Sequence, residues 1–162
     1  MLLLVFSDSH GTMQAMEAAV SFHQPDYVLH LGDCVEDFLA LHSRFPEIPM
    51  EHVPGNCDYG AEGPLTKLLT LEHVPIMLTH GHQYGVKSGY LRVIYAAREQ
   101  QADILLFGHT HHAECFQEGS LWVMNPGAAK NGSYGIITLN QDGIQCRLAH
   151  QDGKERYDAA YH

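Results

Sequence analysis

The stretch "FGHTHH", residues 107–112, places three histidines within four positions, directly after the apolar run Ile104–Phe107. A short apolar run that is followed by a turn signal is typical of a buried strand. Imidazoles at the end of such a strand indicate a polar site at the edge of a sheet. The rest of the chain repeats this arrangement.

Four further apolar runs end in polar groups of the same kind. The run "LLLVF" leads to Ser7–His10, "YVLHL" to Gly32–Asp33, "EHVP" to Gly55–Asp58, and "PIML" to Thr79–His82. The carboxyl ends of parallel strands share one edge of an α/β sheet, and ligands bind there. We therefore expect all five polar groups to converge at one edge.

Three of the five groups contain polar residues that are two positions apart. In an extended segment, residues i and i+2 point to the same side, so each pair is expected to face a common centre. These pairs are Asp8 and His10, His80 and His82, and His109 and His111.

The apolar pattern along the chain predicts an α/β layered sandwich with mixed sheets, in which the first half reads βαβαβ and the second half adds hairpins. Turn signals at Glu72–His73 and in "NQDG" (140–143) separate strand pairs. The whole chain, 1–162, is expected to form one domain with a polar C-terminal tail at about 151–162. Strands are predicted at 2–6, 27–31, around 52–53, 65–71, 75–79, 104–107, 121–124, 135–139 and 144–148.

Three helices are predicted from apolar residues at helical spacing. Each shared face is expected to cover a sheet. The faces carry Met13, Met16 and Val20; Val35, Phe38, Leu39 and His42; and Leu91, Ile94, Tyr95 and Arg98.

Composition narrows the function classes. The net charge of −10, with only nine Lys and Arg, argues against a tight grip on long nucleic acid. The start "MLLLVFSD" has too short an apolar run for a secretory signal or a membrane span. With four widely spaced cysteines and no C-x-x-C pair, we expect reduced thiols in a cytoplasmic protein without a membrane partner.

The polar groups offer carboxylates, an amide and imidazoles, a set that suits Mn²⁺, Fe²⁺, Zn²⁺ or Ni²⁺ better than Ca²⁺. Each group also has a plain structural explanation. Asp8 or Ser9 would cap a helix, Asn56 would support a turn, and His80 would be a core histidine. "GD" at 32–33 is a common turn, and "GHTH" alone is a polar loop. The coincidence of suitable side chains at five strand ends favours a metal site.

In this order, "DSH", "GD", "GNCD", "THGH" and "GHTH" resemble the calcineurin-like metallophosphoesterase superfamily, and most closely its small bacterial and archaeal YfcE-type phosphodiesterase branch. The resemblance covers nearly the whole chain. It implies a four-layer αββα sandwich of two mixed sheets flanked by helices, and two divalent metal ions. The implied ligands are Asp8, His10 and His111 for one ion, Asn56, His80 and His109 for the other, and Asp33 between them.

The chain departs from the family pattern at two positions. Many members have a histidine that assists the leaving group where this chain has Cys57, as in the YfcE-type branch. A thiol with a pKa near ~8.5 is a poor replacement for imidazolium, so diesters with acidic leaving groups are favoured over monoesters. Ala128 replaces a family serine in "NPGAAKNG", and a Pro126–Gly127 turn is the simpler reading of that loop. His82 would supply a proton, support His80 or be exposed.

The resulting hypothesis is a metal-dependent phosphodiesterase that cleaves small phosphodiesters, with two ions roughly 3.5–4 Å apart sharing a hydroxide nucleophile. Mn²⁺ is the expected metal, and Ni²⁺, Zn²⁺ or Fe²⁺ would also fit. Asp33, Asn56, Cys57 and His82 are the catalytic candidates. The alternatives are a non-catalytic scaffold of the retromer-subunit type and, less favoured by the charge, a nuclease. A homo-oligomer is compatible with the sequence.

Overall fold

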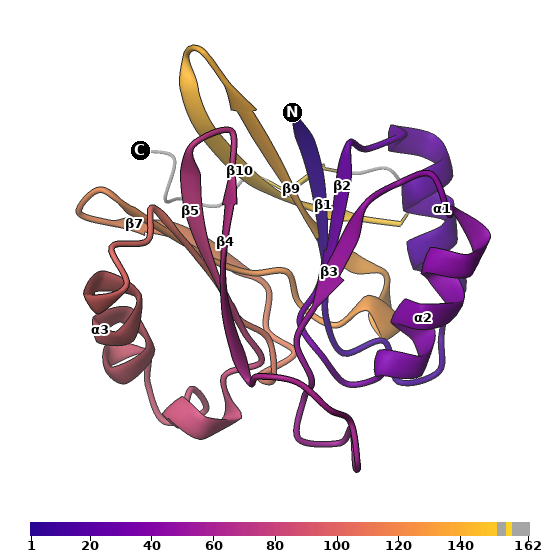
Figure 1. Cartoon of the computed structure of the whole chain (residues 1–162), viewed down its shortest axis with the longest axis horizontal. Coiled ribbons are helices and arrows are strands. Elements are labelled where there is room, and N and C mark those ends of the chain that lie inside the picture. The colour runs from indigo at the N-terminus through magenta and orange to yellow at the C-terminus, as the bar shows by residue number, and fades with distance from the viewer. Residues whose placement is uncertain (152–154, 157–162) are drawn as a thin grey trace.

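The computed structural model describes residues 1–151 and 155–156, and it forms two β-sheets with helices on their outer faces (Figure 1). The first sheet contains β1 (Leu2–Phe6), β2 (Tyr27–His30), β3 (Met50–His52), β9 (Ser133–Asn140), β10 (Gly143–His150) and β11 (Glu155–Arg156). The second contains β4 (Thr66–Leu71), β5 (Val74–Thr79), β6 (Ile104–Leu106), β7 (Glu114–Glu118) and β8 (Leu121–Asn125). The helices are α1 (Gln14–His23), α2 (Val35–Arg44) and α3 (Leu91–Glu99), with short 3₁₀ turns η1 (His82–Tyr84) and η2 (Ala129–Asn131).

The strand orders are β11-β10-β9-β1-β2-β3 and β4-β5-β6-β8-β7, and both sheets mix parallel and antiparallel pairs. Helices α1 and α2 cover the outer face of the first sheet, and α3 covers the outer face of the second (Figure 1). The predicted single-domain αββα sandwich is therefore confirmed.

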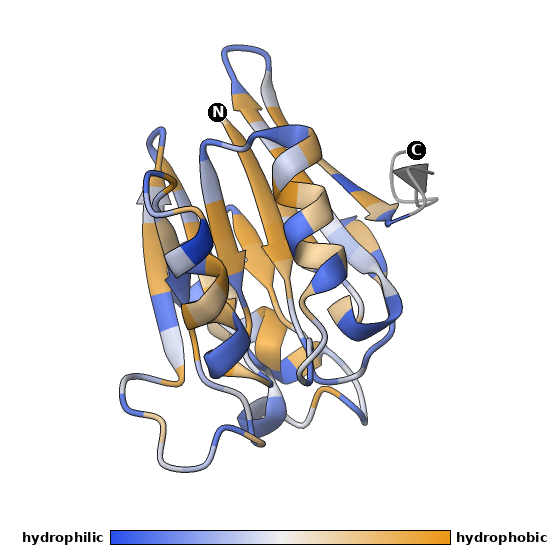
Figure 2. Cartoon of the chain, turned by 90° about the vertical axis from the view of Figure 1, so that its right-hand side faces the viewer, coloured by the Kyte–Doolittle hydropathy of each residue, from blue (hydrophilic) through white to orange (hydrophobic). Residues whose placement is uncertain are grey.

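Alternation along the central strands divides the hydrophobic core into three layers. In β1, Leu3 and Val5 pack between the two sheets, whereas Leu4 and Phe6 pack against α1. In β6, Leu105 points outward, into the layer under α3. Because such strands are buried on both faces, they read as continuous apolar runs, and this explains why they are conspicuous in the sequence. Figure 2 shows these strands as hydrophobic along their length and the loops at their ends as polar.

Parallel pairing fixes where the polar groups lie. Strands β1, β2 and β3 run parallel in one sheet, and β5 and β6 run parallel in the other. The loops after these five strands emerge at the same end of the sandwich. The site therefore lies where two sheet edges meet, instead of along the edge of a single sheet.

The predicted face of the third helix is wrong at Leu91 and Tyr95, whereas Ile94, from the same predicted face, packs against the second sheet as expected. Leu91 and Tyr95 are 66% and 59% exposed, while Val93 and Ala97 are buried against the second sheet. Val93 and Ala97 are four positions apart and small, so the helix can pack closely through them. The larger side chains of Leu91 and Tyr95 are left on the outer side.

Two smaller differences concern α2 and β7. In α2 the buried leucine is Leu41, and Leu39, which the helical spacing placed inside, is 54% exposed. Strand β7 was not predicted, because "ECFQE" begins and ends in charged residues and lies at the sheet edge with one fully buried side chain, Cys115. The two predicted turns are confirmed, since Leu71 pairs with Val74 and Asn140 with Gly143.

The predicted tail at 151–162 lies outside the described residues except for Gln151 and β11, whose backbone pairs with β10. In the part of the chain that the structure describes, no helix has the length and apolar character needed to cross a membrane. The four cysteines, all of them in that part, are present as thiols.

Candidate metal centre

Five predicted ligands sit in the left-handed region of backbone space, where residues other than glycine are uncommon. Their φ angles lie between 47° and 70°. The expectation that the ligand pairs are extended is therefore wrong for these residues, because the chain reverses at the sheet edge immediately after each strand. Backbone strain of this kind concentrates at functional sites. The five residues are Asp8, His10, Asp33, His109 and His111.

The first cluster consists of Asp8, His10 and His111, whose potential ligand atoms all lie within 4.8 Å of one another. Asp8 Oδ1 is 3.1 Å from His111 Nε2 and 3.7 Å from His10 Nε2. The carboxylate is buried, while both imidazoles are partly open to solvent. This cluster brings together the three ligands that the resemblance implies for one ion.

The second cluster consists of Asp33, His80 and His109, also within 4.8 Å of one another. His80 Nε2 lies 3.3 Å from Asp33 Oδ2 and 3.8 Å from Asp8 Oδ1, and His10 Nε2 is 3.9 Å from Asp33 Oδ2. The two clusters therefore adjoin each other through both carboxylates.

Two buried atoms at this junction, Asp8 Oδ1 and His80 Nε2, have no hydrogen-bond partner among the described residues. The other polar atoms of the same side chains are held firmly. Asp8 Oδ2 accepts from Ser7 Oγ at 2.6 Å and from the His109 N–H at 3.1 Å. His80 Nδ1 donates to the Leu31 carbonyl at 2.7 Å, which leaves the Nε2 lone pair directed into the site. A carboxylate oxygen and an imidazole nitrogen that are held in place but lack a hydrogen-bond partner are suited to coordinate a divalent cation.

Electrostatics favour an ionised Asp33. Burial alone would raise its pKa, but the adjacent His80 ring, whose Nε2 lies 3.3 Å away, and the hydrogen bond from the Cys57 N–H outweigh burial and hold the pKa well below its usual range. For His80, burial lowers the pKa and the two neighbouring carboxylates, Asp33 and Asp8, raise it by more. A proton and a metal ion would compete for the same Nε2 lone pair, so metal binding at this cluster would be pH-dependent.

Asn56, Cys57 and His82 border these clusters. Asn56 is exposed, with Nδ2 3.6 Å from Cys57 Sγ, and its role as a ligand stays a prediction. The Cys57 N–H donates to Asp33 Oδ1 at 2.9 Å. Partial burial, followed by the charge of Asp33, raises the pKa of the Cys57 thiol. The His82 ring lies 5.6 Å from that of His80, and burial, together with His80, lowers the pKa of His82.

Asp58, to which the sequence assigned no role, ties two ligand loops together. Its carboxylate accepts from the backbone N–H groups of Asp33 at 2.8 Å, Val35 at 2.8 Å and Gly55 at 2.7 Å. The contact with Val35 also satisfies an N–H in the first turn of α2, where a negative charge is favourable. Asp58 thus positions Asp33 and the Gly55–Asp58 loop relative to each other.

Asn125 holds the loop after β6 in place through hydrogen bonds to its backbone. It is fully buried, donates to the Gly108 carbonyl at 3.0 Å and accepts from the Gly127 N–H at 2.9 Å. In the segment that follows Asn125, the Ala129 N–H donates to the Ser7 carbonyl at 2.7 Å. The Asn-Pro-Gly segment is therefore more than a turn, because it supports the loops that carry Asp8 and His109.

His30 is a third supporting residue that the sequence analysis missed. It is fully buried, and burial lowers its pKa to about 4, so the ring is neutral. Nδ1 accepts from the Gly32 N–H at 3.1 Å and Nε2 donates to Ser9 Oγ at 3.0 Å. The sequence does carry a signal for this role, because a histidine stands inside the otherwise apolar run "YVLHL".

Two glycines permit the close approach of these loops. A Cβ on Gly55 would lie 2.1 Å from Asp33 Oδ1, and one on Gly108 would lie 2.0 Å from Ser7 Oγ and 2.8 Å from Asp8 Oδ2. No side chain fits at either position without displacing a predicted ligand or its support.

An αββα sandwich with paired carboxylate and imidazole clusters at its strand ends has the architecture of a metallophosphoesterase. The chain belongs to the calcineurin-like phosphoesterase superfamily, whose domain model matches residues 1–142. It is 34% identical to the "Probable metallophosphoesterase YsnB" of Bacillus subtilis (strain 168), covering 98% of this chain and 96% of the relative.

Solved structures give the same fold. A conserved uncharacterized protein from Streptococcus pneumoniae TIGR4, described as a predicted phosphoesterase, matches with a TM-score of 0.79 and 26% identity, covering 96% of this chain and 92% of that one. Vacuolar Protein Sorting 29 from Cryptosporidium parvum also matches with a TM-score of 0.79, at 19% identity, covering 96% and 94%. The second likeness concerns the fold alone.

Proposed function

We propose that the chain is a phosphodiesterase that cleaves small phosphodiesters at a centre of two divalent ions. The observation that carries the proposal is the pair of adjoining clusters, with the unpartnered Asp8 Oδ1 and His80 Nε2 at their junction. His10 and His111 complete one cluster, and Asp33 and His109 complete the other. Two ions held there would supply a hydroxide nucleophile and positive charge for the phosphoryl oxygens.

The charge of the ligand set favours an anionic substrate. The two clusters contain two carboxylates, Asp8 and Asp33, and four imidazoles. Neutral imidazoles bind a cation without cancelling its charge, so the loaded centre stays positive inside a chain of net charge −10. Such a centre attracts a phosphoryl group and stabilises the charge that develops on it. With borderline nitrogen and oxygen ligands, Mn²⁺ is the proposed metal, and Ni²⁺, Zn²⁺ and Fe²⁺ also suit the site.

The surroundings of the centre favour diesters with good leaving groups. The raised pKa keeps the Cys57 thiol protonated at neutral pH but makes it a weak proton donor. The lowered pKa leaves little of the protonated form of His82 at neutral pH, so His82 also seldom has a proton to donate. A competent general acid contributes about 10²–10⁴-fold, and without one, substrates whose leaving group departs unaided react best.

The proposal is tested with metal-free protein reloaded with Mn²⁺. Wild type should hydrolyse bis(4-nitrophenyl) phosphate faster than 4-nitrophenyl phosphate. Asp33→Asn should lose at least about 10²-fold in kcat/KM, because the substitution removes the negative charge of a carboxylate that lies between the two clusters. Asp142→Asn, on the exposed turn between β9 and β10, is the matched control and should behave as wild type. Diester activity of Asp33→Asn equal to that of the control would refute the proposal.

The likeness to Vacuolar Protein Sorting 29 keeps a second candidate open, a scaffold with this fold that binds protein partners. The same assay separates the two. Protein that binds Mn²⁺ tightly but turns over neither ester, across a panel of diesters and monoesters, would favour the scaffold.

A further inference from the structure

A pocket of about 500 Å³ opens beside the metal centre, between the start of α2 and the loop after β3. Cys34 and Glu36 lie on the helix side, and Cys57, Asp58 and Tyr59 lie on the loop side. Its volume falls in the range of small-molecule sites, roughly 300–1,000 Å³.

The inner wall of this pocket touches the metal centre. Cys57 donates its N–H to Asp33 Oδ1 at 2.9 Å, and Cys34 directly follows Asp33 in the chain. A phosphoryl group held at the two clusters would therefore have this pocket next to it. One of the ester groups on phosphorus can enter it.

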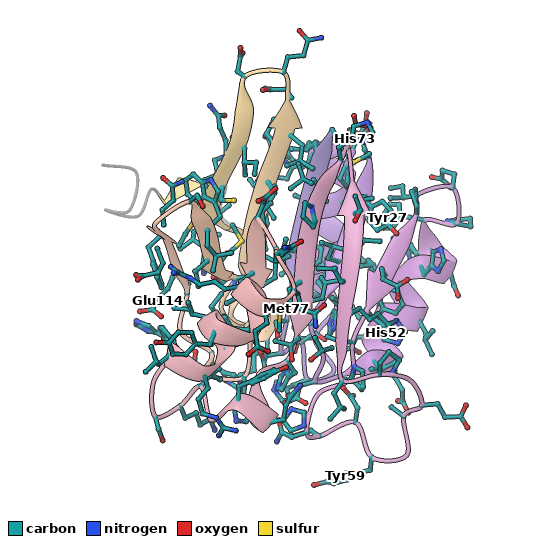
Figure 3. The ribbon with its side chains drawn as sticks, turned by 60° about the vertical axis from the view of Figure 1, so that its left-hand side comes forward. Tyr27, His52, Tyr59, His73, Met77 and Glu114 are labelled. Atoms are coloured by element: carbon teal, nitrogen blue, oxygen red, sulfur yellow. The ribbon has the colours of Figure 1, made fainter. Side chains whose placement is uncertain are left out.

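The two parts of the loop that line the pocket differ in how firmly contacts hold them. Asp58 is fixed by three backbone N–H groups at 2.7–2.8 Å, so the base of the loop is rigid. The next residue, Tyr59, is 92% exposed. Figure 3 shows it at the tip of the loop that follows His52, projecting into solvent. A ring with so little packing around it is free to turn over a group bound at the rim.

The charge of the pocket limits what enters it. The described residues that line it include two carboxylates, Glu36 and Asp58, and neither lysine nor arginine. Asp58 is already neutralised in part by its N–H donors, whereas Glu36 is exposed. A second phosphate or a carboxylate on the ester group would be repelled, while an uncharged ring is accommodated.

We propose that this pocket binds an uncharged aromatic ester group of the substrate, of the aryl or nucleoside type, stacked on Tyr59. The inference rests on the proposed phosphodiesterase function and names its substrate class. Stacking of a base or aryl ring on an aromatic side chain contributes enough to change affinity by about tenfold.

The test compares phenylphosphonate with methylphosphonate, which share the metal-binding group and differ only in the ring. Their dissociation constants for the Mn²⁺-loaded protein are measured by isothermal titration calorimetry. Wild type should bind phenylphosphonate about tenfold more tightly. Tyr59→Phe should keep this preference and Tyr59→Ala should lose it. Tyr95→Ala, which removes a tyrosine that is 59% exposed on α3, is the matched control and should keep it.

A second arm tests the charge of the pocket. 4-Carboxyphenylphosphonate should bind wild type more weakly than phenylphosphonate, and Glu36→Gln should recover about threefold of that loss, as expected for one exposed charge. Equal recovery in Asp142→Asn would show a general charge effect and overturn this part.

The outcomes separate this inference from the proposed function. If wild type binds neither phosphonate, the two clusters do not form a centre that holds a phosphoryl group, and both proposals fail. If wild type binds both equally, or if Tyr59→Ala keeps the preference for the phenyl compound, the phosphodiesterase proposal stands and the aromatic pocket is refuted. Thermal melting checks that each variant folds, which is expected because the substituted side chains of Tyr59, Tyr95, Glu36 and Asp142 are all exposed.

Discussion

Substituting Gly108 by alanine tests the coupling between loop packing and metal binding. Gly108 is not in the positive-φ region, so the effect of a methyl group there is steric. The new Cβ would lie 2.0 Å from Ser7 Oγ and 2.8 Å from Asp8 Oδ2, so the Ser7 hydroxyl must move by more than about 1 Å to reach van der Waals contact. That movement breaks the 2.6 Å hydrogen bond that orients Asp8.

Overpacking typically costs about 1–3 kcal/mol, and a hydrogen bond to a charged group contributes about 1.5–3 kcal/mol. We therefore expect Gly108→Ala to lower the free energy of unfolding by about 2.5–6 kcal/mol. Loss of a group that orients a metal ligand typically weakens metal affinity by about 10–100-fold, and we expect a loss in that range for Mn²⁺.

The matched control is Gly135→Ala in β9, where the added Cβ would lie 2.3 Å from Met124 Sδ and its three nearest atoms belong to Met124 and Val5, not to a predicted ligand. This variant should also be destabilised in urea unfolding, although the flexible methionine can yield. Its Mn²⁺ affinity, measured by calorimetry under conditions where both variants are folded, should remain that of wild type. If Gly108→Ala binds Mn²⁺ within twofold of Gly135→Ala, the proposed link between loop packing and the ligand orientation is refuted.

Three further predictions address acid catalysis, pH and loop support. Cys57→His should raise the turnover of phenyl phosphate, a monoester whose poor leaving group needs a proton donor, at least about tenfold, and unchanged kinetics with this monoester would argue against the missing acid. In the metal-free protein, burial holds the pKa of His30 at about 4 against 6.5 when unfolded, so the unfolded state takes up a proton first. The free energy of unfolding should therefore fall by up to about 3 kcal/mol between pH 6.5 and 4, and His30→Asn should show a correspondingly smaller fall in urea titrations. Asp58→Asn should lose about 1–3 kcal/mol of stability, because an amide nitrogen replaces an acceptor of backbone N–H groups, and an unshifted melting temperature would exclude this role.

The sequence predicts the framework of this fold because its strands are buried on both faces and its turns carry characteristic residues. The runs that become β1 and β6 were recognisable from their apolar character alone. Faces of the partly buried helices were harder to predict, as Leu91 and Tyr95 show, because small residues such as Ala97 decide how closely a helix packs. Edge strand β7 is not predictable from an apolar run, because only one of its side chains, Cys115, is fully buried.

For the site, residue types at strand ends were enough to predict six side chains that the structure gathers into two clusters. The conformations that bring them together were not predictable, because left-handed backbone at residues such as His109 depends on contacts from other loops. The supporting roles of Asn125, Asp58 and His30 depend on hydrogen bonds between segments far apart in the chain. A single sequence does not display such long-range pairing.

Counting the manganese ions bound per chain is the most direct test of the paired metal centre. Protein stripped with a chelator is dialysed against Mn²⁺, and bound manganese is counted by mass spectrometry for wild type, Asp33→Asn and the Asp142→Asn control. Wild type and the control should each hold two ions per chain, and Asp33→Asn should hold fewer. One ion or none in wild type, or two ions held equally well by Asp33→Asn, would show that the two clusters do not form a shared centre.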